Sequence, residues 1–168
     1  EEVQGQIWTQ GQGKFTSHWL PSFDDVNEKV AFGLEITFHK SFEVVSNGIL
    51  VTKRETGDNI SWQYQMQNPM SSYLVMLAIG HYEIQNSTSK SKIPLENYYE
   101  KTELNNVEPT YRYSTQIFDF LENEIGYAYP WQIYRQIPVH DFLYAGMENT
   151  SATIFSTDFV VDSIGYFD

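Results

Sequence analysis

The segment AFGLEITFHK, residues 31–40, alternates apolar and polar side chains along most of its length. A strand turns successive side chains to opposite faces, so this period of two predicts a half-buried β-strand. The segment ISWQYQM, residues 60–66, repeats the alternation. We expect residues 6–84 to form one twisted sheet whose first long strand directs four side chains inward: Phe32, Leu34, Ile36 and Phe38.

Turn signals and a long apolar run divide this β-rich region. Ser46-Asn47-Gly48 lies between two apolar runs and predicts a hairpin turn. The run of residues 71–84 predicts a long strand that bends near Gly80. Residues 86–94 are polar and end in proline, which is typical of a linker with little regular structure.

The hydrophobic period changes after this linker. Residues 110–125 carry apolar side chains at helical spacing, and Gly126 suits the left-handed conformation that ends many helices. Residues 132–139 alternate again and predict a strand. The sequence therefore predicts an α+β fold that is mostly β. It divides into a β-sheet domain at 1–86, a linker at 87–93 and a second domain at 94–168.

The composition excludes several classes of protein. The 168 residues include only 10 lysines and arginines and carry a formal net charge of −12. Nucleic-acid binding depends on clustered basic side chains, so no nucleic-acid partner is expected. The chain has no cysteine, which excludes disulfides and thiolate metal sites. No apolar stretch is long enough to predict a membrane span. We expect a soluble chain, and its compartment stays open between cytoplasmic and exported.

Three segments in order carry a family resemblance. TQGQGKFTSHWLPSFDDVNEK spans residues 9–29, a β-rich stretch that includes SNGIL and SSYLVMLAIG spans residues 44–80, and YPWQIYRQIPVHDFLYAGMENTSATIF spans residues 129–155. Together they resemble the M1 family of zinc aminopeptidases. The resemblance implies a mixed, twisted sheet from the late part of a saddle-like N-terminal domain. It also implies that a partial thermolysin-like catalytic domain follows, with one long helix and a strand pair.

The resemblance assigns the recognition of the substrate's amine to Glu148. In that family the glutamate of the Gly-x-Met-Glu-Asn motif binds the free α-amino group of a peptide, which a carboxylate does by a charge-assisted hydrogen bond. Gln12 matches the glutamine that faces the same pocket, and Gln10 is its neighbour in the Thr-Gln-x-Gln pattern. Side chains that bind one dipeptide-sized group must lie within about 10 Å of each other, because a residue of extended peptide spans roughly 3.3–3.6 Å.

The other matched residues surround the motif. Gly146 and Met147 would lie along the substrate backbone, where a missing Cβ allows close approach. Tyr144 matches an aromatic residue that lines the first side-chain pocket. The family usually begins the motif with glycine, whereas this chain has Ala145 there. The resemblance therefore leaves a backbone contact at Ala145 in doubt.

The zinc ligands of the family are expected outside this chain. The family holds zinc with a His-Glu-x-x-His helix and a further glutamate. The four histidines here lie at no spacing that would place two on one helix face: His18, His39, His81 and His140. The resemblance places the zinc helix and the catalytic tyrosine after Asp168. We expect no catalytic residue, no metal and no turnover in the isolated chain, and zinc only in the parent protein.

Several alternatives stay open at this stage. A lone carboxylate such as Glu148 is most often a strand residue that points to water. Some relatives have lost the zinc ligands, so a non-catalytic scaffold is the main rival to an enzyme. The sequence also does not separate a plain peptidase from one with an added epoxide hydrolase activity. The expected partners are peptides with a free N-terminus and the remainder of the parent protein.

Overall fold

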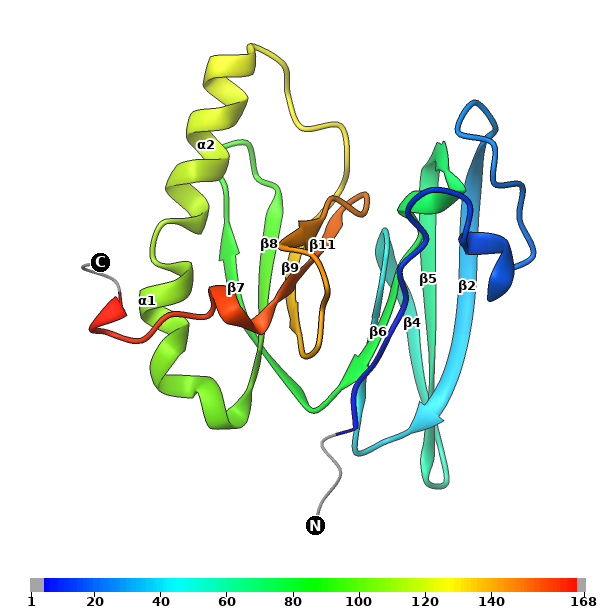
Figure 1. Cartoon of the computed structure of the whole chain (residues 1–168), viewed down its shortest axis with the longest axis horizontal. Helices are drawn as coiled ribbons and strands as arrows, with labels where there is room; N and C mark the ends of the chain where they lie inside the picture. Colours follow the sequence, from blue (N-terminus) through cyan, green and yellow to red (C-terminus); the bar gives the residue numbers. More distant parts are fainter. Residues whose placement is uncertain (1–4, 166–168) are drawn as a thin grey trace.

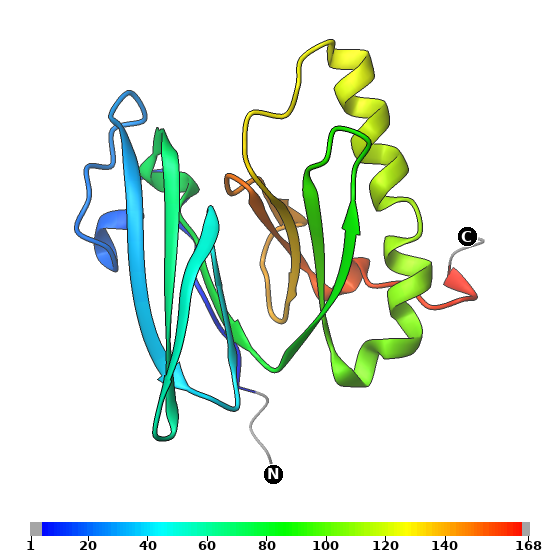
Figure 2. The ribbon, with the colours of Figure 1, turned by 180° about the vertical axis from the view of Figure 1, so that it is seen from behind.

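The computed structural model describes residues 5–165, and its strands form three sheets (Figure 1). Sheets A and B belong to the N-terminal part, which we define as residues 5–80. Sheet C belongs to the C-terminal part, residues 82–165. The helices α1 (Val107–Tyr111) and α2 (Ser114–Ile125) cover the face of sheet C that points away from the N-terminal part, and the opposite view in Figure 2 shows the same order of layers.

Sheets A and B are both antiparallel, with the orders β1-β6-β3 and β2-β5-β4. Short 3-10 helices precede β2 and β6. The elements of this part are β1 (Ile7–Trp8), η1 (Thr16–His18), β2 (Lys29–His39), β3 (Glu43–Ser46), β4 (Ile49–Thr56), β5 (Asn59–Ser71), η2 (Ser72–Leu74) and β6 (Leu77–Gly80).

The alternation predicted for the two long strands is confirmed. Along β2 the four apolar side chains are half-buried and the residues between them are exposed. Along β5 the side chains of Trp62, Tyr64 and Met66 are buried, and those of Gln63 and Gln65 are exposed. The inward faces of both strands pack in the clusters that form the core of sheet B.

The prediction of a single sheet and of a hairpin at Ser46-Asn47-Gly48 is wrong. β3 pairs with β6 in sheet A, whereas β4 pairs with β5 in sheet B, so Asn47 and Gly48 form a corner between two sheets. Gly48 has a φ of 76°, and an added Cβ would lie 2.2 Å from the carbonyl oxygen of Gln65. The glycine therefore signalled a left-handed turn, but local turn chemistry does not specify which strand the chain pairs with next.

Sheet C is mixed, with the order β10-β11-β9-β8-β7. β9 pairs in parallel with both β8 and β11, and the outer pairs are antiparallel. The elements of this part, besides the helices, are β7 (Tyr82–Thr88), β8 (Pro94–Glu100), η3 (Lys101–Asn106), β9 (Tyr134–Val139), β10 (Gly146–Met147), β11 (Ala152–Ser156) and η4 (Thr157–Phe159).

The segment predicted as a linker is a β-hairpin. β7 and β8 pair from Tyr82 and Glu100 to Thr88 and Pro94, and residues 89–93 form the turn between them. Pro94 is the first residue of its strand, a position that tolerates a missing N–H donor. The chain instead changes sheet at Gly80 and His81, where the predicted bend falls.

The predicted helix is present but interrupted. Arg112 and Tyr113 separate α1 from α2, and Gly126 ends α2 with a φ of 66° as its sequence position indicated. Side chains on the apolar side of α2, such as Ile117, Leu121 and Ile125, are exposed. The helices within residues 5–165 are too short or too polar to cross a lipid bilayer.

The main core lies between sheets A and C. Val45, Met76 and Ala78 of the N-terminal part are fully buried against a group from the C-terminal part that includes Met147 and Ile154. Burial of this shared apolar surface is what joins the two parts, since apolar area removed from water stabilises at about 25 cal/mol per Å². The strand that carries the Gly-x-Met-Glu-Asn motif is therefore anchored in the same core.

Candidate functional site

The motif residues lie on an edge strand of sheet C and directly after it. Gly146 and Met147 form β10, which pairs with β11 opposite Phe155 and Ile154. Met147 and Asn149 are each 2% exposed, whereas Glu148 between them is exposed. The Glu148 carboxylate makes no hydrogen bond or ion pair with any residue in 5–165. Two buried neighbours thus hold the backbone, and the carboxylate stays free to bind a ligand.

The residues before Glu148 leave room along the edge strand. A Cβ added to Gly146 would lie 3.4 Å from the Ile154 carbonyl, an ordinary contact, so the fold itself does not demand glycine there. Ala145 has no positive φ, and its carbonyl accepts a hydrogen bond from the Ser156 N–H at 3.2 Å. The methyl group at the motif's first position therefore fits the strand without backbone strain.

Tyr144 projects from the same loop. Its ring is 55% exposed and makes an edge-to-face contact with Phe142 at 6.1 Å between centroids. Phe142 is buried and contacts Trp8 of β1 in turn. The tyrosine therefore stands on a packed aromatic base while most of its own surface faces outward.

The glutamines of the N-terminal part differ in exposure. Gln12 is exposed, and its backbone N–H donates to Gln10 Oε1 at 3.0 Å. The Gln10 Nε2 atom is buried and has no hydrogen-bond partner among the described residues. Asn149 Oδ1, next to Glu148, is unpaired in the same way. Buried polar atoms are normally satisfied, so both atoms have bonding capacity to offer a ligand.

Both segments contact the stretch from η2 to β6. The Thr9 N–H donates to the Leu77 carbonyl at 3.0 Å, and Asn149 Nδ2 donates to the Leu74 carbonyl at 3.3 Å. The structure thus brings the Thr-Gln-x-Gln segment and the motif loop to neighbouring points of residues 74–77. A single pocket shared by Gln12 and Glu148 remains a prediction.

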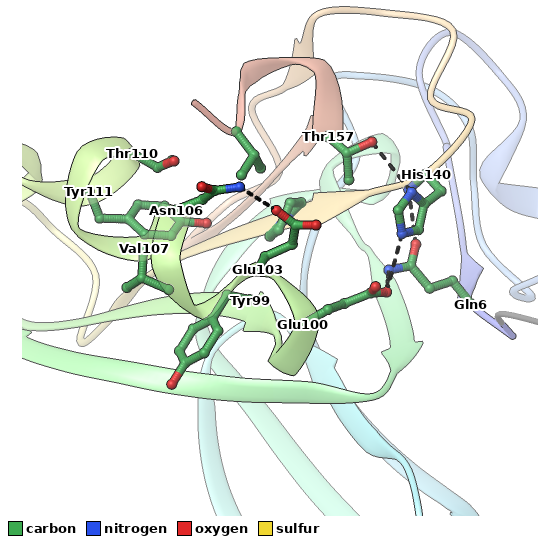
Figure 3. Close-up of a pocket in the computed structure, with 12 residues that line it drawn as sticks. Gln6, Tyr99, Glu100, Glu103, Asn106, Val107, Thr110, Tyr111, His140 and Thr157 are labelled. Atoms are coloured by element: carbon green, nitrogen blue, oxygen red, sulfur yellow. Dashed lines mark hydrogen bonds and ion pairs between the residues drawn. The ribbon is translucent and has the colours of Figure 1, made fainter. Parts of the chain in front are cut away.

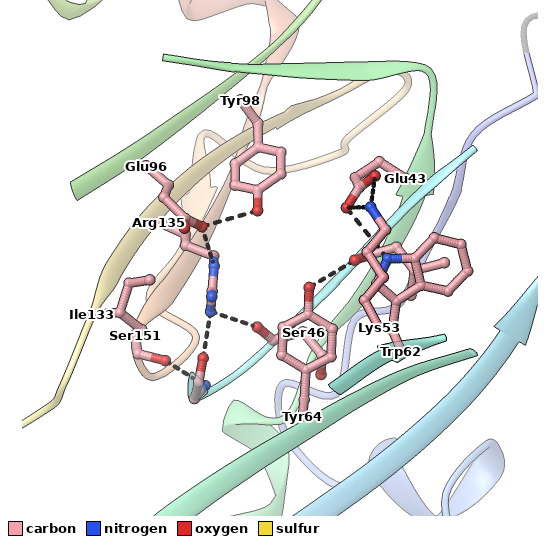
Figure 4. Close-up of polar contacts among 12 residues, drawn as sticks. Glu43, Ser46, Lys53, Trp62, Tyr64, Glu96, Tyr98, Ile133, Arg135 and Ser151 are labelled. Atoms are coloured by element: carbon pink, nitrogen blue, oxygen red, sulfur yellow. Dashed lines mark hydrogen bonds and ion pairs between the residues drawn. The ribbon is translucent and has the colours of Figure 1, made fainter. Parts of the chain in front are cut away.

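A buried arginine joins the two parts beside this loop (Figure 4). Arg135 of β9 is 2% exposed, and its Nε lies 2.7 Å from Glu96 Oε2 of β8. Its Nη1 donates to the carbonyl oxygens of Ser46, at 3.1 Å, and Gly48. We call Arg135, Glu96 and the residues they bind, Tyr98, Ser46 and Gly48, the junction cluster.

The charge state of Arg135 is secured by its neighbours. Burial alone would lower the pKa of Arg135, but Tyr98 and Glu96 raise it, and the net shift is upward. Tyr98 donates its hydroxyl to Glu96 Oε2 at 3.0 Å, and the guanidinium lies over the Tyr64 ring at 5.4 Å from its centroid. The cluster therefore holds a paired, permanently charged arginine at the boundary between the parts.

A polar pocket of about 250 Å³ lies on another side of the boundary (Figure 3). Gln6 Nε2 donates to Glu100 Oε1 at 2.7 Å, and the His140 backbone N–H donates to Gln6 Oε1 at 2.9 Å. The His140 ring lies 3.3 Å from Glu100 through Nε2. The other ring nitrogen, Nδ1, lies 3.5 Å from Thr157 Oγ1, so the two ring nitrogens face Glu100 and Thr157.

The residues that the structure describes do not fit a zinc site. No three histidine, aspartate or glutamate side chains within residues 5–165 lie close enough together to hold a metal ion. The four histidines belong to separate places: His18 in η1, His39 at the end of β2, His81 between β6 and β7, and His140 after β9.

Comparison with known families finds two domain models that match this chain. Residues 1–74 match the peptidase M1 N-terminal domain, and residues 110–165 match the peptidase family M1 domain. The chain belongs to peptidase family M1. The match to the two domains in this order also agrees with the two parts of the fold.

Relatives of this M1 chain come from distant organisms. It is 30% identical to glutamyl aminopeptidase of Bos taurus over 133 residues, which are 77% of this chain and 14% of that protein. It is 26% identical to a probable aminopeptidase 1 of Sulfurisphaera tokodaii over 150 residues, 89% of this chain and 19% of that protein. It is also 26% identical to aminopeptidase N of Streptomyces lividans over 165 residues, again 19% of the relative. The chain thus spans less than a fifth of each of these relatives.

Sequence reasoning missed two residues that support the motif. Asn47 was assigned to a hairpin turn and Arg135 to an ordinary strand. Both side chains are buried. A signal existed for Arg135, since arginine within an otherwise apolar strand is rarely buried without a charged partner.

Proposed function

We propose that the protein carrying this chain is an aminopeptidase that removes N-terminal residues from peptides, with Glu148 as the anchor for the substrate's ammonium group. The observation that carries the proposal is the free carboxylate of Glu148 between two fully buried neighbours, directly after the edge strand β10 of sheet C. An exopeptidase has to recognise one positive charge at the end of its substrate. A carboxylate on a rigid backbone does this by a charge-assisted hydrogen bond.

The neighbouring residues have matching roles in this proposal. The edge of β10 at Gly146 and Met147 offers backbone groups to an extended peptide, as exposed sheet edges do. Gln12 and Gln10 provide amide groups near the same end, and Tyr144 lines the side-chain pocket. Ala145 has no positive φ, so the first motif position is compatible with the role. The names of the relatives, all aminopeptidases, support the same activity.

Zinc enters this proposal only through the family. When bound, the metal would activate the water that attacks the peptide bond. Since the described residues do not form its ligand set, we propose that the ligands belong to other segments of the full-length protein. The residues of this chain bind and orient the peptide.

The test is a comparison of two peptides that differ only in N-terminal acetylation, with the full-length protein. The wild type should cleave the free-amine peptide and cleave the acetylated one poorly. Glu148→Gln should lower kcat/KM for the free-amine peptide by roughly 30-fold or more, corresponding to about 2–5 kcal/mol for a desolvated charge pair. Glu35→Gln, at an exposed strand position of β2, is the matched control and should change nothing.

Two results would contradict the proposal. Equal cleavage of both peptides by the wild type would show that the enzyme does not recognise the amine. Binding of peptides with no cleavage of either would favour the non-catalytic scaffold instead.

A further inference from the structure

Asn47 occupies the corner between β3 and β4 and reaches across to the motif loop. Its side chain is 4% exposed and makes three hydrogen bonds. Nδ2 donates to the carbonyl of Thr150 at 2.6 Å and to the carbonyl of Leu74 at 2.9 Å. Oδ1 accepts from the Met76 N–H at 2.7 Å. One amide therefore binds the motif loop and the η2–β6 stretch at once.

The loop after Glu148, residues 149–151, is held from both sides. The Gly48 N–H donates to Ser151 Oγ at 2.8 Å, and the Arg135 N–H donates to the Ser151 carbonyl at 2.9 Å. Ser151 has a φ of 64°, a conformation that costs a non-glycine residue free energy unless its surroundings fix it. The corner at 47–48 and strand β9 together provide that restraint.

The carbonyl of Leu74 connects these contacts. It accepts from Asn47 Nδ2 and also from Asn149 Nδ2, at 3.3 Å. The two asparagines therefore share one acceptor, and Asn149 directly follows Glu148, the amine anchor. Because the Glu148 side chain has no partner of its own within residues 5–165, its place depends on the backbone on either side of it.

We propose that Asn47 is a positioning residue for Glu148, which it places by holding the carbonyl of Thr150 and the shared acceptor Leu74. This inference rests on the proposed function, because it gives Glu148 the role of amine anchor. Loss of the amide would leave the Thr150 and Leu74 carbonyls without their buried donor and free the loop to shift. A small displacement of a binding group is enough to weaken catalysis strongly.

The test is a double-mutant cycle in the full-length protein. Asn47→Ala should lower kcat/KM for the free-amine peptide by about tenfold to a hundredfold, mostly through KM, and change the acetylated peptide much less. In a Glu148→Gln background the same substitution should change kcat/KM by no more than about twofold, because the anchor through which it acts is already lost.

Asn97→Ala is the matched control. Asn97 is 2% exposed, close to the 4% of Asn47, and both ends of its amide are bonded, to Gln85 at 3.2 Å and to Gln136 at 2.9 Å. It does not contact the motif loop. Its replacement should lower the melting temperature as Asn47→Ala does, yet leave the preference for free-amine over acetylated peptide unchanged.

Ser151→Gly keeps the inference testable if Asn47→Ala does not fold. It removes the hydroxyl that binds Gly48 and suits the positive φ, and it should reduce the amine preference in the same direction but less. An unchanged preference in a folded Asn47→Ala or Ser151→Gly, with the preference lost in Glu148→Gln, would overturn the role of Asn47 alone. An unchanged preference in Glu148→Gln itself would overturn the amine anchor.

Discussion

The junction cluster and the polar pocket both join the N-terminal part to sheet C, but they differ in how fully their groups are bonded. Arg135 has a carboxylate and two backbone carbonyls as partners and is almost entirely buried. The His140 side chain is 36% exposed, and its Nε2 is near Glu100 without a well-aligned hydrogen bond. The first cluster therefore has one low-energy arrangement, whereas the second can adjust at little cost.

This difference matters because of where each cluster lies. Arg135 binds the Gly48 corner and, through its backbone, the Ser151 end of the motif loop. His140, by contrast, follows the other end of β9, where it and Gln6 contact Glu100. The cluster beside the amine anchor is thus rigid, and the one at the pocket is looser. We expect this arrangement if the fold fixes its geometry only beside the group that binds the substrate.

The largest effect is expected from Arg135→Met. It leaves Glu96 without its cation and two buried carbonyls without a donor, so we expect a loss of about 3–5 kcal/mol in the free energy of unfolding. Chemical denaturation of the full-length protein measures this, with Arg54→Met on the exposed face of β4 as the control. A loss of less than about 1 kcal/mol would show that the junction cluster stabilises the fold no more than an exposed ion pair does.

Alkaline pH should destabilise the junction cluster through Tyr98. Burial raises the pKa of Tyr98 well above its usual value, so above pH of about 10 the unfolded chain loses that proton while the folded chain keeps it. Stability is then full below about pH 10 and falls as pH rises, by about 1.4 kcal/mol per pH unit for each such tyrosine.

Two neighbouring tyrosines separate this effect from general alkaline damage. Tyr98→Phe should flatten the fall in melting temperature above pH of about 10, because it removes a buried titrating group. Tyr99→Phe should flatten it much less, since the Tyr99 hydroxyl bonds to Glu83 at the surface. Equal flattening by both variants would show that burial at the junction is not the cause.

The smallest effect is expected from Glu100→Gln in the polar pocket. The amide oxygen can still accept from Gln6, and only the ion-pair contact with His140 is lost. The free energy of unfolding should fall by less than about 1 kcal/mol, as measured by chemical denaturation. A loss of about 3 kcal/mol or more, as for a buried ion pair, would contradict this account of the pocket.

The parts of the fold that were predicted are those that local pattern determines. The alternation along Phe32 to Phe38 specified the buried face of β2, and Gly126 marked the end of α2 because few residues adopt its φ. Sheet membership was not predicted, because Asn47 and Gly48 have the same turn chemistry in a hairpin and in a corner between sheets. Residues 86–94 have the polar composition of a linker and also that of a hairpin turn.

The motif residues of the site were predicted through resemblance, whereas the residues that hold the motif loop in place were not predicted. Glu148, Met147 and Gly146 were identified from the motif, and the structure places Gly146 and Met147 on an edge strand with Glu148 directly after it. Asn47 and Arg135 could not be assigned to the site, because their partners lie 103 and up to 89 positions away in the sequence. The packing of sheet A against sheet C brings Asn47 to the motif loop, and the parallel pairing of β9 with β11 brings Arg135 there.

The most direct measurement is a crystal structure of the full-length protein with a bound peptide analogue that has a free N-terminal amine. We expect the ammonium nitrogen within about 3.2 Å of a Glu148 carboxylate oxygen, with Gln12 contributing to the same pocket and the Asn47 contacts to Thr150 and Leu74 intact. An amine bound elsewhere, with Glu148 still facing solvent, would contradict the account.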